Sequence, residues 1–428
     1  MTDDQIRPIT IDRVGKTGDV TTFGQKVIIC ALLTLVVLLV VLRPLALKTG
    51  PSGDFMTIFR QTQDFWFGKP VYSGGNPYLP STYVVMCWQS AISPHGAWLA
   101  WRVIGIVMSL ASGLLLYKSL AARLGHHYAA VASCNVLLLS GMSPWSGNPG
   151  NLAGIGCVLS YASLMAGSPI IAGIILGFAT GLKYSLGLFF IIIALVARFR
   201  RYVFAALATF IMLNLFGLFY LATHGTSARE VICSLCSGVS YVGGFDESGF
   251  QRYFSVNNPY RFQLTNILPF LHSLGVERTL AHTLCLIVLM VAAILALYCA
   301  ATGRPRLLLG AALFSPFFLL CTYHRFYDSA LLAFPLLLSW IVHSEHRRIV
   351  LWVPIVCSAA FFLSISNIVQ TRLFTGTNFL ESWVWNYVIG PHHWFALAAI
   401  CTTSLLIVLE ILVEASWSKR LHVTREFP

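Results

Sequence analysis

A histidine, an arginine and an aspartate lie close together in the segment CTYHRFYDS, as His324, Arg325 and Asp328. The arginine guanidinium is a planar fork of N–H donors that matches a phosphate group, and an imidazole can add another donor. Aromatic residues flank the pair, so a role in an interfacial aromatic belt is the alternative. Because the segment follows an apolar run, His324 and Arg325 are candidate phosphate ligands at the end of a membrane helix.

Lys183 is the only Asp, Glu, Lys or Arg in residues 124–197. A charge in such apolar sequence costs about 2.5–3.5 kcal/mol at the middle of a membrane, and residues of this kind tend to face a water-filled cavity on the path of a ligand. The alternative is that the long side chain extends from a helical hairpin to the membrane surface. We predict that Lys183 faces a ligand.

Asp54, in PSGDF, follows the first long apolar run, where Pro51 and Gly53 interrupt a helix. A carboxylate at this place can reach substrates from lipid and from water, and it can accept a proton from a hydroxyl nucleophile. Aspartate is also a favoured helix N-cap, and the stretch that follows has helical character. The two roles are compatible, and Asp54 is the candidate general base.

Other polar residues are candidates for substrate contacts. Arg60 and Asp64 stand four residues apart, a spacing typical of an exposed helical ion pair. Asparagines gather in SGNPGNLAG and in FSVNNPYRFQ, where turn formation is the ordinary explanation. The full set of these candidates is Arg60, Asp64, Tyr78, Asn148, Asn151, Asn257 and Asn258.

Composition places the chain in a membrane. Of its 428 residues, 57% are hydrophobic and 10% are charged, whereas a soluble domain carries about 25% charged residues. The net charge is +12, but the basic residues occupy short gaps between apolar runs. That distribution follows the positive-inside pattern of membrane proteins and argues against nucleic-acid binding.

The apolar runs predict an all-α polytopic protein with about twelve transmembrane helices. The expected spans are 26–47, 97–117, 128–143, 150–166, 169–182, 183–197, 202–222, 279–301, 307–322, 328–342, 349–368 and 393–414. The pair that meets at Lys183 is short enough to form two half-depth helices.

The basic gaps give the orientation. Placing them inside makes both termini cytoplasmic: a polar N-terminus at 1–25, a single transmembrane domain at 26–414 and a tail at 415–428. These gaps contain Lys118, Arg123, Arg198, Arg200, Arg201, Arg304, Arg306, Arg347, Arg348, Lys419 and Arg420. Long outer loops then lie at 48–96, 223–278 and 369–392, and the first should contain short helices. Long loops of this composition usually carry function.

Several common sites are absent from the sequence. It has no P-loop, no G-x-G-x-x-G after a strand, no H-E-x-x-H and no D-x-D in an outer loop. Cys233 and Cys236 form the only C-x-x-C, without a second pair at zinc spacing, and either a disulfide or helix packing would explain them. We therefore expect no metal, no cofactor and no use of ATP.

The segment GDFMTIFRQTQDFWFGKPVYSGGNPY, from Gly53 to Tyr78, resembles the first outer loop of glycosyltransferase family 87, whose members have the GT-C fold. Downstream, Ala172, Gly173 and Gly177 match an A-G-x-x-x-G block of that family. Lys183 matches its lysine, and HRFYDSALLAFPLL is similar to its late outer motif. The resemblance covers most of the chain.

The resemblance implies a hexosyltransferase of the inner (plasma) membrane, active on its extracytoplasmic side. The donor would be a polyprenyl-phosphate-linked sugar of the mannose type, and the acceptor a hydroxyl of a lipid or glycan of the cell envelope. Asp54 would be the general base, and Lys183, His324 and Arg325 would hold the donor phosphate. The alternatives are a secondary transporter or lipid flippase, or a structural membrane subunit. A transporter should carry charges near the bilayer midplane and an internal repeat.

Overall fold

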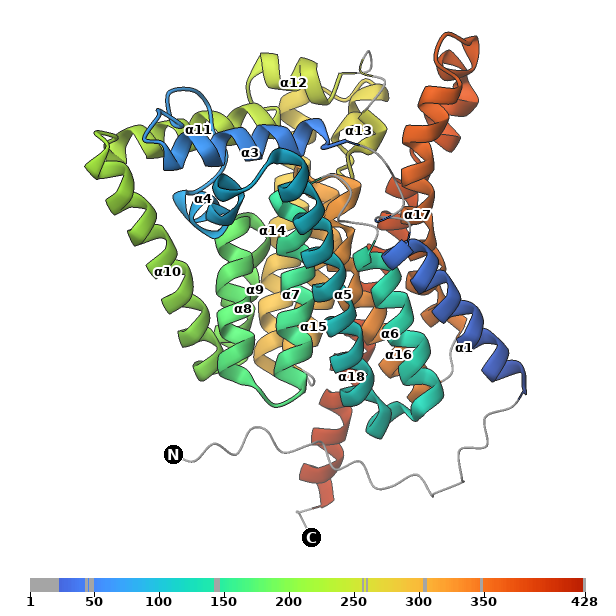
Figure 1. Cartoon of the computed structure of the whole chain (residues 1–428). Helices are drawn as coiled ribbons and strands as arrows, with labels where there is room; N and C mark the ends of the chain where they lie inside the picture. Colours follow the sequence, from blue (N-terminus) through green and yellow to red (C-terminus); the bar gives the residue numbers. More distant parts are fainter. Residues whose placement is uncertain are drawn as a thin grey trace.

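The computed structural model of the chain describes residues 23–42, 45, 50–141, 147–255, 258, 261–302, 306–346 and 349–425. Within these residues the chain is all-helical, with seventeen α-helices joined by short 3₁₀ and π turns (Figure 1). Most of the predicted N-terminal segment at 1–25 lies outside the described residues. So do Arg304, Arg347 and Arg348, three of the residues used for the orientation.

In the part of the chain that the structure describes, five helical segments are long and apolar enough to cross a membrane, which makes the chain a multi-pass membrane protein by length and composition. Three of them are single helices: α5 (Pro94–Leu124), α10 (Arg200–Thr223) and α14 (Arg278–Thr302). The first segment, Phe23–Leu42, consists of α1 (Phe23–Val36) and a π turn. The last segment, Trp385–Val413, belongs mostly to α18 (His392–Arg425). Each of them exposes several large apolar side chains, as expected for helices that face lipid.

Shorter helices complete the bundle. They are α6 (His126–Gly141), α7 (Pro149–Met165), α8 (Pro169–Leu182), α9 (Tyr184–Val196), α15 (Arg306–Cys321), α16 (Ala333–His346) and α17 (Trp352–Leu373). Within the described residues, each of the twelve predicted apolar segments overlaps a helix, and most ends lie within a few residues of those predicted. The main departure is α18, which continues as a helix to Arg425 through most of the expected tail.

Small residues let α8 approach α10 closely. A Cβ on Gly177 would lie 2.7 Å from the carbonyl oxygen of Ala206, and one on Gly173 would overlap the carbonyl of Tyr202. Close backbone packing at such glycines is a main source of helix association in membranes. It fixes the direction of α8 and therefore the position of Lys183 at its end.

A layer of shorter helices covers one end of the bundle (Figure 1). It contains α3 (Gly53–Trp66), α4 (Pro80–Val85), α11 (Ala228–Gly243), α12 (Glu247–Tyr253) and α13 (Leu268–Ser273). We call this end the α3 face. In Figure 1, α1 begins and α18 ends on the opposite side of the bundle.

The helix α3 confirms the helical stretch predicted after Pro51 and lies across the bundle end with one apolar side. Phe55 packs on Trp98 and Trp101 of α5, with ring centroids 4.9 and 6.3 Å apart. The N-cap is Ser52, whose hydroxyl accepts a hydrogen bond from the backbone N–H of Phe55 at 3.2 Å. The cap role weighed for Asp54 is therefore wrong: Asp54 sits in the first turn, and its carboxylate is available to other groups.

Candidate functional site

A cavity of about 1120 Å³ lies under the α3 face. Its wall includes the four main candidates from the sequence, Asp54, Lys183, His324 and Arg325. They come from three separate places: the first turn of α3, the junction of α8 and α9, and two adjacent positions after α15. The structure thus brings together residues up to 271 positions apart in the chain.

Lys183 stands where α8 stops and α9 starts, as the sequence predicted. Its backbone is extended, with φ −150° and ψ 94°, so it separates two helices that would otherwise be continuous. The end of α8 is capped by α4: the Ser81 hydroxyl donates to the carbonyl of Gly181 at 2.9 Å, and the Thr82 hydroxyl donates to that of Leu182 at 3.1 Å. These bonds satisfy carbonyls that the helix end leaves open.

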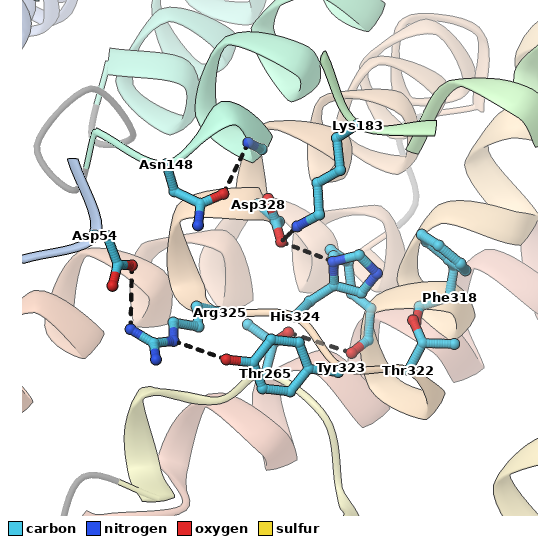
Figure 2. A network of polar contacts seen from close by, with 12 residues as sticks. Asp54, Asn148, Lys183, Thr265, Phe318, Thr322, Tyr323, His324, Arg325 and Asp328 are labelled. Atoms are coloured by element: carbon cyan, nitrogen blue, oxygen red, sulfur yellow. Dashed lines mark hydrogen bonds and ion pairs between the residues drawn. The ribbon is translucent and has the colours of Figure 1, made fainter. Parts of the chain in front are cut away.

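Asp328 holds Lys183 and His324 together (Figure 2). Its Oδ2 atom lies 2.8 Å from Lys183 Nζ and 2.7 Å from His324 Nδ1. The Asp328 side chain is 0% exposed, and His324 is also buried. Because an ionised carboxylate only accepts hydrogen bonds, the proton of the His324 ring lies on Nδ1. Burial lowers the pKa of His324, and the Asp328 carboxylate acts in the opposite direction.

Arg325 lies beside Asp54, apart from the group formed by Asp328, Lys183 and His324 (Figure 2). The distance from Arg325 Nη1 to Asp54 Oδ2 is 3.3 Å, and Arg325 Nε donates to the Tyr323 hydroxyl at 3.2 Å. The Arg325 and Asp54 side chains are 25% and 31% exposed. Burial raises the pKa of Tyr323 to about 12, so its hydroxyl remains a neutral acceptor at physiological pH.

The backbone around His324 and Arg325 is fixed by the segment that precedes α13. The Thr265 N–H donates to the carbonyl of His324 at 2.8 Å, and Leu264 and Arg325 form an antiparallel bridge. The ring of Phe318 packs against that of His324 with centroids 4.6 Å apart. The backbone that carries both side chains is therefore fixed by its hydrogen bonds to the segment before α13, and the His324 ring is fixed by packing on Phe318.

Tyr78 and Asn148 also line the cavity. The Asn148 amide donates to the Tyr78 hydroxyl at 3.2 Å, while its Oδ1 atom accepts from Gly150 N at 2.9 Å as the N-cap of α7. Asn148 is thus both a capping residue and a lining residue. A Cβ on Gly150 would come within 2.9 Å of Lys183 Nζ and would overlap Asp328 Oδ1, so the absence of a side chain there makes room for the ion pair.

The remaining candidates are less central. Asp64 pairs with Lys69 at 3.3 Å rather than with Arg60, which is exposed, so the expected i,i+4 pair is wrong. Asn151 is buried in α7. Asn258 lines the cavity and donates to the carbonyl of Arg252 at 2.8 Å.

The other asparagine of that loop, Asn257, lies outside the described residues. Cys233 and Cys236 are exposed free thiols on α11, which does not fit the packing role considered for them.

Asp328 was not among the site residues predicted from the sequence, although the sequence contains a signal for it. Asp328 is the only acidic residue between Glu277 and Glu345, and Lys183 is equally isolated. Buried charges in proteins are nearly always paired, so two isolated opposite charges in apolar sequence should have been expected to meet.

The cavity has a second, aromatic wall. Arg252, Tyr241 and Tyr253 line it, with the Arg252 guanidinium 5.6 Å from the Tyr253 ring centroid and donating to Tyr241 Oη at 2.9 Å. Across the described part of the chain, no group of three or more His, Cys, Asp or Glu side chains is placed to hold a metal ion. Comparison with models of protein families, with curated proteins and with solved structures finds no match for this chain.

Proposed function

We propose that the chain is a membrane glycosyltransferase that moves a hexose from a polyprenyl-phosphate-linked donor to a hydroxyl group of a lipid or glycan acceptor. The observation that carries the proposal is the cavity under the α3 face, where a carboxylate, Asp54, faces the cations Lys183 and Arg325 and the imidazole of His324. The resemblance of Gly53–Tyr78 and of the segments around Lys183 and His324 to glycosyltransferase family 87 supports the same class.

The cavity wall suits an amphiphilic donor. Beside the charged groups it includes Leu286 and Leu289 of α14 and Val239 and Phe245 at the α11 end. Leu286 and Phe245 are largely exposed, and α14 is one of the helices apolar enough to cross a membrane. A lipid-linked sugar could place its chain along these side chains while its phosphate reaches the cations.

In the proposed reaction Asp54 removes the proton of the acceptor hydroxyl as that oxygen attacks the anomeric carbon. The bond from this carbon to the phosphate oxygen breaks on the opposite side, so the configuration inverts. Lys183 and Arg325 stabilise the negative charge of the leaving polyprenyl phosphate through charge-assisted hydrogen bonds. His324, which donates its Nδ1 proton to Asp328, holds that carboxylate beside Lys183. The proton ends on Asp54 and returns to water when the product leaves.

The proposed topology places the α3 face outside the cytoplasm, with both termini inside and about twelve crossings. Two observations support it: basic residues gather in alternate gaps, and α1 begins and α18 ends on the side away from α3 (Figure 1). The donor would enter from the bilayer with its sugar outside, so neither ATP nor a nucleotide sugar is needed.

The test is sugar transfer by the protein in nanodiscs, with a panel of polyprenyl-phosphate sugars. We expect Asp54→Asn to reduce transfer by about 10²–10⁴-fold, the usual contribution of a general base. Its thermal stability should stay close to wild type, because Ser52 caps α3. Full activity in Asp54→Asn would exclude the base role, and a requirement for a nucleotide sugar would exclude the donor class. Lipid translocation without transfer would favour the flippase alternative.

A further inference from the structure

Asp328 and Asp54, the two carboxylates that pair with cations of the cavity wall, differ in how easily a ligand could replace them at those cations. Asp328 is buried and lies within 2.8 Å of both Lys183 and His324, whereas Asp54 and Arg325 are partly exposed and 3.3 Å apart. Charge-assisted N–H···O bonds are ordinarily about 2.7–2.9 Å long, so the Asp54–Arg325 contact is loose. Exposed ion pairs of this kind contribute little to stability.

We infer that a donor phosphate displaces Asp54 from Arg325, so that the general base is held in an ion pair until the donor binds. The inference rests on the proposed function, and it adds an order of events to it. In the empty cavity Arg325 neutralises Asp54. In the donor complex Arg325 neutralises the phosphate, and Asp54 is released toward the acceptor.

Contacts other than the one with Asp54 keep Arg325 in place during this exchange. Its Nε atom donates to Tyr323 Oη, and its backbone is bridged to Leu264. Asp54 is anchored separately, in the first turn of α3, where the partial positive charge of a helix N-terminus stabilises a carboxylate. Each partner therefore keeps its position when the contact between them is lost.

Charge balance makes the exchange the easiest way to admit a phosphate. At this end of the cavity Lys183 and Arg325 face Asp328 and Asp54, so an incoming anion meets cations that already have counter-charges. Asp328 is enclosed by protein and could move only by leaving two charged or polar partners in a buried place. Asp54 borders the cavity, where water can solvate it after release.

The exchange would also free the Asp54 carboxylate for the acceptor. Once Arg325 pairs with the phosphate, Asp54 Oδ2, which lies 3.3 Å from Arg325 Nη1 in the empty cavity, can accept the hydrogen of the acceptor hydroxyl. The base then becomes available at the stage when a sugar is ready to receive the oxygen. Acceptor activation is then coupled to the presence of the donor.

Farnesyl phosphate, an isoprenoid phosphate without a sugar, tests the exchange by binding alone. Isothermal titration calorimetry in nanodiscs would measure its affinity for wild type, Asp54→Asn, Arg325→Gln and the double variant. If Asp54 competes for Arg325, then Asp54→Asn should bind the probe about three- to tenfold more tightly than wild type. Arg325→Gln should bind it at least tenfold more weakly, and Asp54→Asn should then give no further gain.

Glu247→Gln is the matched control. It removes one negative charge, and the ion-pair partner of Glu247, Arg278, also lines the cavity. It should leave the affinity within twofold of wild type. An unchanged or weaker affinity in Asp54→Asn would overturn the exchange while leaving the proposed function intact. An equal gain in the Arg325→Gln background would also overturn it, because it would reveal a general field effect. Failure of wild type to bind the probe would contradict the donor class and the exchange together.

Discussion

Two carboxylates meet cations of the cavity wall in different surroundings. Asp328 is surrounded by protein and holds Lys183 and His324 through one oxygen atom, at 2.8 and 2.7 Å. Asp54 lines the cavity, is partly exposed and contacts Arg325 at 3.3 Å. The buried group fixes the positions of Lys183 and His324, whereas the partly exposed group is the one that the proposed exchange would separate from its cation.

The difference follows from solvation. A buried charge that loses its partner is left in a medium that cannot solvate it, at a cost of about 3–5 kcal/mol. An exposed pair that separates regains water on both sides, at a cost of about 0–1 kcal/mol. We therefore expect substitutions of Asp328 to act mainly on stability and those of Asp54 mainly on chemistry.

The largest effect on stability is expected for Asp328→Ala. It should lower the free energy of unfolding by about 3–5 kcal/mol, because Lys183 would be left without its buried counter-charge. Asp54→Ala should lower it by about 1 kcal/mol or less, as expected for an exposed pair. Thermal unfolding in detergent, followed by tryptophan fluorescence, gives the comparison.

The double variant Lys183→Met, Asp328→Leu sharpens this prediction. Replacing both members of a buried pair by apolar residues usually costs little stability, so the double variant should be more stable than Asp328→Ala. It should nevertheless lose transfer activity, since the proposed phosphate ligand is gone. If Asp328→Ala proves as stable as Asp54→Ala, the contrast between the two carboxylates fails.

A smaller effect is expected for Gly150→Ala, which keeps every charged group. The added methyl group would meet Asp328 Oδ1 and Lys183 Nζ and push the pair apart. Overpacking of this kind usually costs about 1–3 kcal/mol. Gly154→Ala, one turn further along α7, is the control, because its nearest neighbour is the Ala330 methyl at 3.3 Å. Equal stability and equal donor KM in the two variants would show that the ion pair tolerates displacement.

The helices of the bundle could be predicted from the sequence because apolar runs of the required length leave few alternatives in lipid. The break at Lys183 was predictable for the same reason, since a charge interrupts the run. The pairing of Lys183 with Asp328 was harder to foresee, because 145 residues separate the two and no local pattern connects them. The sequence shows that each charge is isolated among apolar residues. It therefore predicts that each has a partner, but it does not identify that partner.

Rules that use only neighbouring residues gave the wrong helix cap and the wrong ion-pair partner in α3. Ser52 and Asp54 are both good N-caps, and only the position at which the chain turns into α3 decides between them. Asp64 lies four residues after Arg60, yet α3 ends near it, and Gly68, with φ +69°, turns the chain so that Lys69 folds back. The backbone N–H of Lys69 donates to the carbonyl of Asp64 at 2.8 Å, which brings its side chain to the carboxylate.

The smallest effect is expected for Asp64→Asn, which sharpens the role assigned to Asp54. Both carboxylates belong to α3, and both lie 3.3 Å from a cation. The Asp64–Lys69 pair, however, is 43% and 65% exposed and takes no part in the cavity wall among the described residues. Asp64→Asn should change the free energy of unfolding by less than about 0.5 kcal/mol and leave sugar transfer unaltered. Loss of transfer in Asp64→Asn comparable to that in Asp54→Asn would mean that the charge of α3 as a whole, rather than the cavity position of Asp54, supports the reaction.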